Sequence, residues 1–143
     1  MLKPTEKRIE FMKEKDNVIY SLPYYLASDT IQRMVLHHTA MITNHNAAIL
    51  LEEPESHAFP FYTKILAETI SRNIKNQFFL TTHNPYFLLT LIEKTPVTDL
   101  AVFLVEMKDY QTKAILLTER DLQEFLDKDI DIFFNLGSFS KLF

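Results

Sequence analysis

Glycine is almost missing from this sequence: Gly137 is the single glycine among 143 residues, where average usage of about 7% would give about ten. The phosphate-binding loop GxxxxGK[ST] and the dinucleotide-binding turn GxGxxG each need at least two glycines. The sequence therefore cannot hold a complete loop of either kind by itself.

Cysteine and long apolar runs are missing too. Without cysteine there is no disulfide framework, thiolate metal site or cysteine nucleophile. This fits a reducing compartment, and we expect a cytoplasmic protein. No apolar run approaches the 18 or more residues of a membrane span, and the first residues, MLKPTEKR, lack the apolar core of a signal peptide. We expect no membrane partner.

The charge balance is mildly acidic, with a formal net charge of −4. A dedicated nucleic-acid-binding protein usually shows a basic stripe, so charge gives no support to a nucleic-acid partner. With 47% apolar and 24% charged residues, the chain can build an ordinary soluble core. Its length predicts one domain over residues 1–143.

The apolar pattern predicts strands that alternate with helices. The expected elements are a hairpin over 9–12 and 18–25, a helix from 28 or 29 to 42, a strand over 47–51, a helix over 60–70, a strand over 78–80, a helix over 85–92, paired strands over 100–107 and 113–117, and a helix from 118 through 126. The continuous run 47–51 is typical of a strand buried on both faces. The stretch from Asp129 onward shows no clear element. This order predicts an α/β fold with a partial, mainly parallel sheet and flanking helices, preceded by a short N-terminal hairpin.

Polar side chains follow two successive predicted strands. Glu52 and Glu53 come after the first strand, and His83 comes after the second. The separation of Glu53 and His83 is about one strand–helix–strand crossover. If the two strands are neighbours, all three side chains open on the crevice where ligands bind in α/β sheets.

Two adjacent carboxylates at a strand end suit magnesium-assisted phosphate chemistry. One can hold the water shell of the metal, and the other can orient an attacking water. A histidine across the crevice can hydrogen-bond a terminal phosphate. The alternative is that Glu52 and Glu53 only solvate a strand end and cap the next helix.

Three segments resemble the motifs of ATP-binding-cassette (ABC)-type ATPases, in particular the AAA and overcoming-lysogenisation-defect (OLD) proteins, whose head fold is shared with SMC proteins. Residues 48–60, AILLEEPESHAFP, resemble the Walker B motif and D-loop. Residues 80–88, LTTHNPYFL, resemble the switch-histidine segment, and residues 22–33, LPYYLASDTIQR, resemble a degenerate signature segment. The three occur in the family's order, so the chain resembles the C-terminal half of such an ATPase.

The resemblance implies roles by position. Glu52 aligns with the acid that orders Mg²⁺, Glu53 with the catalytic glutamate and His83 with the histidine that senses the γ-phosphate. Glu55 and His57 fall on the D-loop, which reaches the opposing subunit. Ser28 and Asp29 fall on the signature segment, which contacts the ATP held by that subunit. The physics suits this last role, because a helix N-terminus attracts anions.

Simpler interpretations stay open for these segments. Ser28 and Asp29 also fit an ordinary helix N-cap. His57 is either a solvated side chain or part of a divalent-metal site with Glu53 and Glu55. His37, His38 and His45 are expected at solvated or core-edge positions.

The sequence also departs from the family pattern. The Walker A loop is missing, Glu52 stands where Asp is usual, and Thr30 stands where glycine is common and can obstruct close backbone approach to a phosphate. We expect an ATPase half-domain that uses ATP and Mg²⁺ only in a completed site and is inactive alone. A truncated, non-catalytic interaction or regulatory module that keeps the fold is the alternative.

The resemblance also implies a gap in the sheet. The Walker A strand of these ATPases lies beside the strand that carries the switch histidine, so its loss leaves an exposed strand edge, which invites pairing. We expect that the strand over 100–107 re-pairs to close the gap. Alternatively, the chain associates with a second copy of itself, as a dimer, or with a complementary Walker A-bearing chain.

Overall fold

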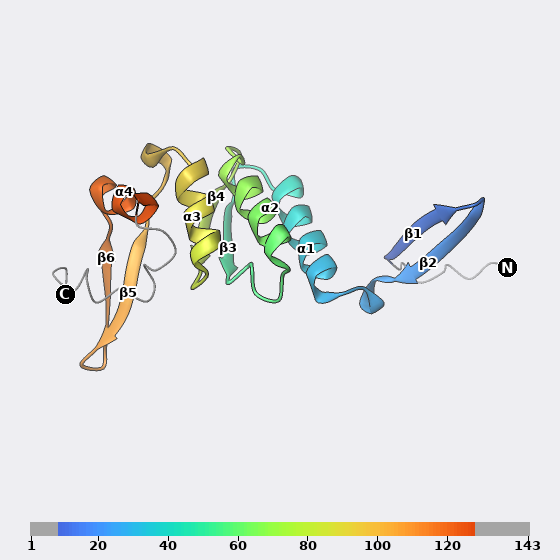
Figure 1. Cartoon of the computed structure of the whole chain (residues 1–143), viewed down its shortest axis with the longest axis horizontal. Helices are drawn as coiled ribbons and strands as arrows, with labels where there is room; N and C mark the ends of the chain where they lie inside the picture. Colours follow the sequence, from blue (N-terminus) through green and yellow to red (C-terminus); the bar gives the residue numbers. More distant parts are fainter. Residues whose placement is uncertain (1–8, 128–143) are drawn as a thin grey trace.

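A computed structural model describes residues 9–127. Its helices and strands follow one another in a row, with a hairpin at one end, a helix-covered strand pair in the middle and a second hairpin at the other end (Figure 1). The predicted α/β fold is confirmed. The stretch from Asp129 onward lies outside the described residues.

The N-terminal hairpin consists of β1 (Glu10–Lys15) and β2 (Val18–Pro23), paired antiparallel. Asp16 and Asn17 form its turn with φ of 53° and 60°. Two successive left-handed residues are the signature of a type I′ turn, whose twist matches that of the strands. A short 3₁₀ helix, Tyr24–Leu26, leads from the hairpin to α1 (Asp29–Thr43).

The central unit consists of two parallel strands under three helices. Strand β3 (Ala48–Glu52) pairs in parallel with β4 (Gln77–Thr81), and α2 (Pro60–Ser71) connects them. Helix α3 (Pro85–Lys94) follows β4. Both α2 and α3 carry proline at the start, where no intrahelical N–H bond is lost.

The C-terminal unit begins with a 3₁₀ turn, Val97–Asp99. Strands β5 (Phe103–Lys108) and β6 (Gln111–Leu116) pair antiparallel, and α4 (Glu119–Asp127) follows them. A capping box with Asp in place of Glu forms at the start of α4: the Thr118 N–H donates to Asp121 Oδ2 at 2.8 Å, and the Asp121 N–H donates to Thr118 Oγ1 at 3.3 Å.

Helix α3 links two apolar clusters. Its Phe87 and Leu91 pack with Met41, Ala67 and Ile70 from α1 and α2. Its Ile92 packs with three residues of the C-terminal unit, Leu117, Leu122 and Phe125. Helix α3 therefore connects the central unit to the C-terminal unit.

The structure excludes one of the alternatives expected for the sheet edge, and it contradicts the expected burial of β3. Strand β5 does not re-pair beside β4; within the described residues it pairs only with β6, so the sheets are three separate pairs. Strand β3 is also not buried on both faces. Its Ile49 is buried, but Leu50 is 74% exposed and its partner in β4, Phe79, is 53% exposed. An apolar run predicts a strand, but it cannot show what covers each face.

Candidate functional site

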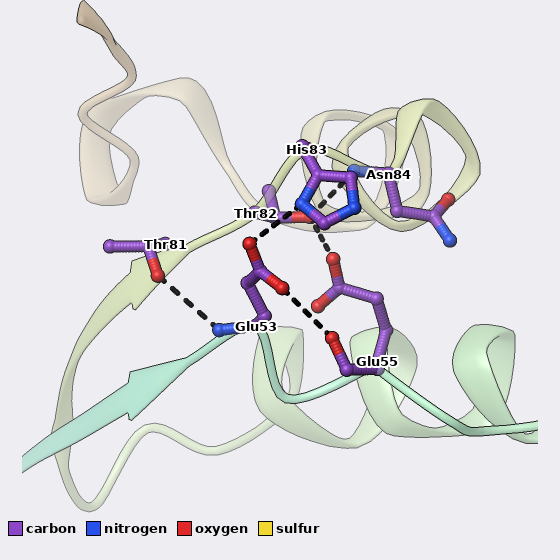
Figure 2. Close-up of polar contacts among 7 residues, drawn as sticks. Glu53, Glu55, Thr81, Thr82, His83 and Asn84 are labelled. Atoms are coloured by element: carbon purple, nitrogen blue, oxygen red, sulfur yellow. Dashed lines mark hydrogen bonds and ion pairs between the residues drawn. The ribbon is translucent and has the colours of Figure 1, made fainter.

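The carboxyl ends of β3 and β4 bring an acid and an imidazole together. Nδ1 of His83 lies 2.7 Å from Oε1 of Glu53, across the 30 residues that separate them in sequence (Figure 2). The two strands pair in register up to Glu52 and Thr81, so both loops leave the sheet at the same edge. Of the three side chains predicted to meet at the strand ends, Glu53 and His83 are in contact.

The backbone of Glu53 is held in an unusual conformation. Its φ is 41°, in the left-handed region that costs a non-glycine residue about 1–3 kcal/mol. The Glu53 N–H donates to the Thr81 carbonyl at 3.0 Å and to Thr81 Oγ1 at 3.3 Å, which extends the parallel ladder by one residue. This anchoring turns the Glu53 side chain toward His83.

The Glu53 carboxylate has a second partner. The Ser56 hydroxyl donates to Glu53 Oε2 at 3.0 Å. The Ser56 hydrogen bond, followed by His83, lowers the pKa of Glu53, although partial desolvation acts in the opposite direction. Glu53 is therefore ionised at neutral pH. Its side chain is 43% exposed and that of His83 is 74% exposed, so a ligand can reach both.

Glu55 is buried, although a charged residue in a polar loop is usually exposed to solvent. It is only 5% exposed and accepts a hydrogen bond from the Thr82 hydroxyl, which joins the loop after β3 to the loop after β4 (Figure 2). Its other oxygen, Oε2, is buried without a partner. In this conformation Glu55 ties two loops together rather than facing a ligand.

Ser28, Asp29 and His57 lie near one another at the start of α1. Ser28 is the N-cap of α1, but its side chain makes no capping hydrogen bond. Ser28 and Asp29 are exposed. Thr30 Oγ1 donates to the His57 carbonyl at 3.0 Å, which joins the signature-like segment to the D-loop-like segment.

Metal-ligating side chains do not gather anywhere in residues 9–127: no group of three or more His, Cys, Asp or Glu is arranged to hold an ion. This gives no support to a metal site around His57. Glu52 is the exposed last residue of β3. An open groove of about 490 Å³ lies beside His83, lined by residues 55–58 and 83–86.

Sequence reasoning found Glu53 and His83 but missed three neighbours. The roles of Ser56, Thr81 and Thr82 come from hydrogen bonds to Glu53 and Glu55. Pro54 was a turn signal for Ser56, because proline is favoured at position i+1 of a β-turn and Ser56 is then residue i+3. The contacts of Thr81 and Thr82 with the other loop left no local signal.

A pair of parallel strands under a helical layer, with an acid and an imidazole at the strand ends, occurs in several α/β folds, the P-loop ATPases among them. The comparisons point to the P-loop ATPases. The chain belongs to the family described as "AAA domain, putative AbiEii toxin, Type IV TA system", whose sequence profile matches residues 3–89. It is thus a fragment of an ABC/AAA-type P-loop ATPase.

Among solved structures, one similar chain comes from a study of the ATP-driven dimerization and DNA-stimulated activation of SMC ATPases. The TM-score is 0.60 and the identity 14%, over 90% of this chain and 76% of that chain. At this identity the likeness shows the fold alone. A search of curated protein sequences found no match. In residues 9–127 no helix has the length and apolar character to cross a membrane.

Proposed function

We propose that this chain is the Walker B-bearing part of an ATPase, in which Glu53 and His83 act on MgATP once a phosphate-binding loop is supplied. The contact between Glu53 Oε1 and His83 Nδ1 carries the proposal. It places an ionised carboxylate beside a hydrogen-bonding imidazole at the edge of the sheet where α/β proteins bind ligands.

Glu53 would orient and polarise the attacking water. A carboxylate does this when one oxygen lies within about 2.6–3.2 Å of the water. Hydrogen bonds keep Glu53 ionised, so it can accept a bond from that water at neutral pH. His83 would release Oε1 and hydrogen-bond the terminal phosphate, a movement its exposed ring allows.

Glu52 fits the role of the Mg²⁺ acid. Mg²⁺ is usually held by one or two carboxylates together with substrate phosphates and water, rather than by a cage of protein ligands. Glu52 is a single exposed carboxylate at the rim of the sheet, which suits that arrangement. When bound, the ion would neutralise charge on the phosphates.

The segments around Ser28 and His57 would meet the nucleotide of another subunit. Ser28 and Asp29 expose the N-terminus of a 15-residue helix, where free N–H groups and the helix dipole favour an anion. His57 is exposed beside this end of α1. Glu55, being buried, would instead keep the two loops together.

The need for a partner is supported by the bare face of the sheet. Parallel sheets normally carry helices on both faces, and here Leu50 and Phe79 are exposed on the face away from the helices. A Walker A-bearing segment, from another chain or from a longer form of this protein, would add strands and cover this face. A second copy would then complete the dimer.

The test is calorimetry and phosphate release with MgATP, for the chain alone and together with a polypeptide that carries GxxxxGK[ST]. The coding sequence next to this chain is the first place to look for one. We expect weak binding alone, and binding with turnover in the mixture. Glu53→Gln should retain binding and lower turnover about 100-fold or more. His83→Ala should also lower turnover.

Matched controls separate the site from general damage. Glu68→Gln removes an acid that pairs with Arg72 on α2, and His38→Ala removes an exposed histidine of α1; both should leave turnover unchanged. Full turnover in Glu53→Gln, or no MgATP binding in the mixture, would favour the non-catalytic module instead.

A further inference from the structure

We infer that Ser56 is a positioning residue for Glu53. Ser56 Oγ donates to Glu53 Oε2 at 3.0 Å, while His83 occupies the other oxygen, Oε1, at 2.7 Å. The carboxylate is therefore held at both oxygens by two independent groups. Of these two partners of the Glu53 carboxylate, Ser56 lies in the loop after β3, which also contains Glu53, and His83 lies in the loop after β4.

A tight turn places the Ser56 hydroxyl. The Ser56 N–H donates to the Glu53 carbonyl at 2.9 Å, so residues 53–56 close into a β-turn. Pro54 follows Glu53 and is fully buried, which fixes the path of the chain. Since the backbone bond remains in any non-proline substitution, the effect of the hydroxyl can be measured apart from the turn.

The consequence for catalysis rests on the proposed function. When His83 leaves Oε1 for a phosphate, Glu53 loses one of its two restraints at the moment when Oε1 must meet the water. The Ser56 bond to Oε2 is then the remaining side-chain restraint seen in this structure. A displacement of about 1 Å can reduce a rate about 100-fold. Ser56 should therefore act on turnover and not on nucleotide affinity.

The first experiment measures this restraint without any activity. Three-bond N–Cγ and C′–Cγ couplings in the isotopically labelled chain report the χ1 populations of Glu53. Because His83 still holds Oε1 in the isolated chain, the comparison is made in the His83→Ala background. We expect one rotamer in His83→Ala and in His83→Ala/Ser56→Thr, and averaged couplings in His83→Ala/Ser56→Ala. Ser56→Cys keeps the size but donates weakly, so it should resemble alanine.

Ser71→Ala is the matched control, because the Ser71 hydroxyl donates to the Ala67 carbonyl at 2.9 Å inside α2, away from the site. It should leave the Glu53 couplings unchanged. Couplings in His83→Ala/Ser56→Ala that equal those of His83→Ala would overturn the inference. The inference would also be overturned if Ser56→Thr, made in the same background, failed to restore a single rotamer of Glu53 while its amide spectrum remained that of the folded chain.

The second experiment uses the chain mixed with the Walker A-bearing polypeptide. Ser56→Ala should lower kcat about 10- to 100-fold with little change in KM for MgATP, and Ser56→Thr should recover most of it. A change confined to KM would overturn the inference. If the unmodified mixture shows no turnover, the proposed function fails, and the coupling experiment still decides whether Ser56 restrains Glu53.

Discussion

Thr30, in the first turn of α1, donates a hydrogen bond from Oγ1 to the carbonyl of His57 at 3.0 Å. The bond joins segments 27 residues apart. His57 has a φ of 60°, a conformation that a β-turn loop can keep only if its neighbours hold it. Glycine, which the resemblance leads one to expect at this position, cannot make this contact because it has no side-chain hydroxyl.

Thr30→Val should loosen this contact while keeping the shape of the side chain. We expect a loss of about 0.5–1.5 kcal/mol in the free energy of unfolding, the usual net value of one hydrogen bond, measured by urea denaturation. Amide exchange should rise in the loop that contains His57. Thr30→Ser keeps the hydroxyl and should behave like the unmodified chain; equal losses in both variants would contradict this role.

The capping box of α4 predicts an acid-sensitive helix. The Thr118 hydroxyl, and next the Thr118 N–H, lower the pKa of Asp121. A carboxylate with a lowered folded-state pKa stabilises the fold above its unfolded pKa, and this stability is lost as the pH falls through the folded value. Thr118→Ala should cost about 0.5–2 kcal/mol at pH 7.

Urea denaturation of Thr118→Ala and the unmodified chain at a series of pH values checks this. The difference between them should shrink as the pH falls below 3.8, the ordinary pKa of the carboxyl. Glu119→Gln changes an acid in the same first turn that lies outside the capping box. It should not reproduce the pH-dependent loss of stability seen with Thr118→Ala. A difference that stays constant with pH would exclude Asp121 as the titrating group.

The helices were predictable because residues that cap or begin a helix occur at their N-termini in the sequence. Asn84 and Pro85 mark the start of α3: the Asn84 side chain accepts the Phe87 N–H at 3.2 Å, as an N-cap does. Thr118 and Asp121 mark the start of α4 in the same way. The contact between Glu53 and His83 was predictable because the carboxyl ends of neighbouring parallel strands lie at the same edge of the sheet.

The rest depends on contacts that leave no mark in a short window of sequence. Glu55 sits in a polar loop and looks solvated, but it is buried and hydrogen-bonded to Thr82, 27 residues away. Leu50 lies in an apolar run and looks buried, but the helices cover only the other face of its strand. In both cases a partner distant in sequence decides the exposure.

His37 gives a second pH dependence. It arises mainly from the burial of a base, whereas that of Asp121 arises from hydrogen bonds to an acid. Burial, and next the charge of Arg33, lower the pKa of His37 below its ordinary value of 6.5. The unfolded chain therefore takes up a proton as the pH falls through 6.5, whereas the folded chain takes it up only at lower pH. Proton uptake stabilises the unfolded state, so the free energy of unfolding should fall between pH 7.5 and pH 5.5.

His37→Gln should remove most of this pH dependence, as measured by urea denaturation at the two pH values. His38→Gln alters the exposed neighbour on the same helix and should leave it in place. Arg33→Gln removes the second cause and should weaken the dependence only in part. An unchanged slope in His37→Gln would assign the effect to another group.

The bare face of β3 and β4 gives a prediction about assembly. Leu50 and Phe79 are exposed in this chain, so Leu50→Lys and Phe79→Lys should change its free energy of unfolding by about 0.5 kcal/mol or less. If a Walker A-bearing segment packs on this face, each lysine would be buried there without a charged partner, which is strongly unfavourable. Co-purification and phosphate release should then both fall. Ile74→Lys, at a site that is 94% exposed before β4, should affect neither, and full assembly of the Leu50 and Phe79 variants would show that the partner packs elsewhere.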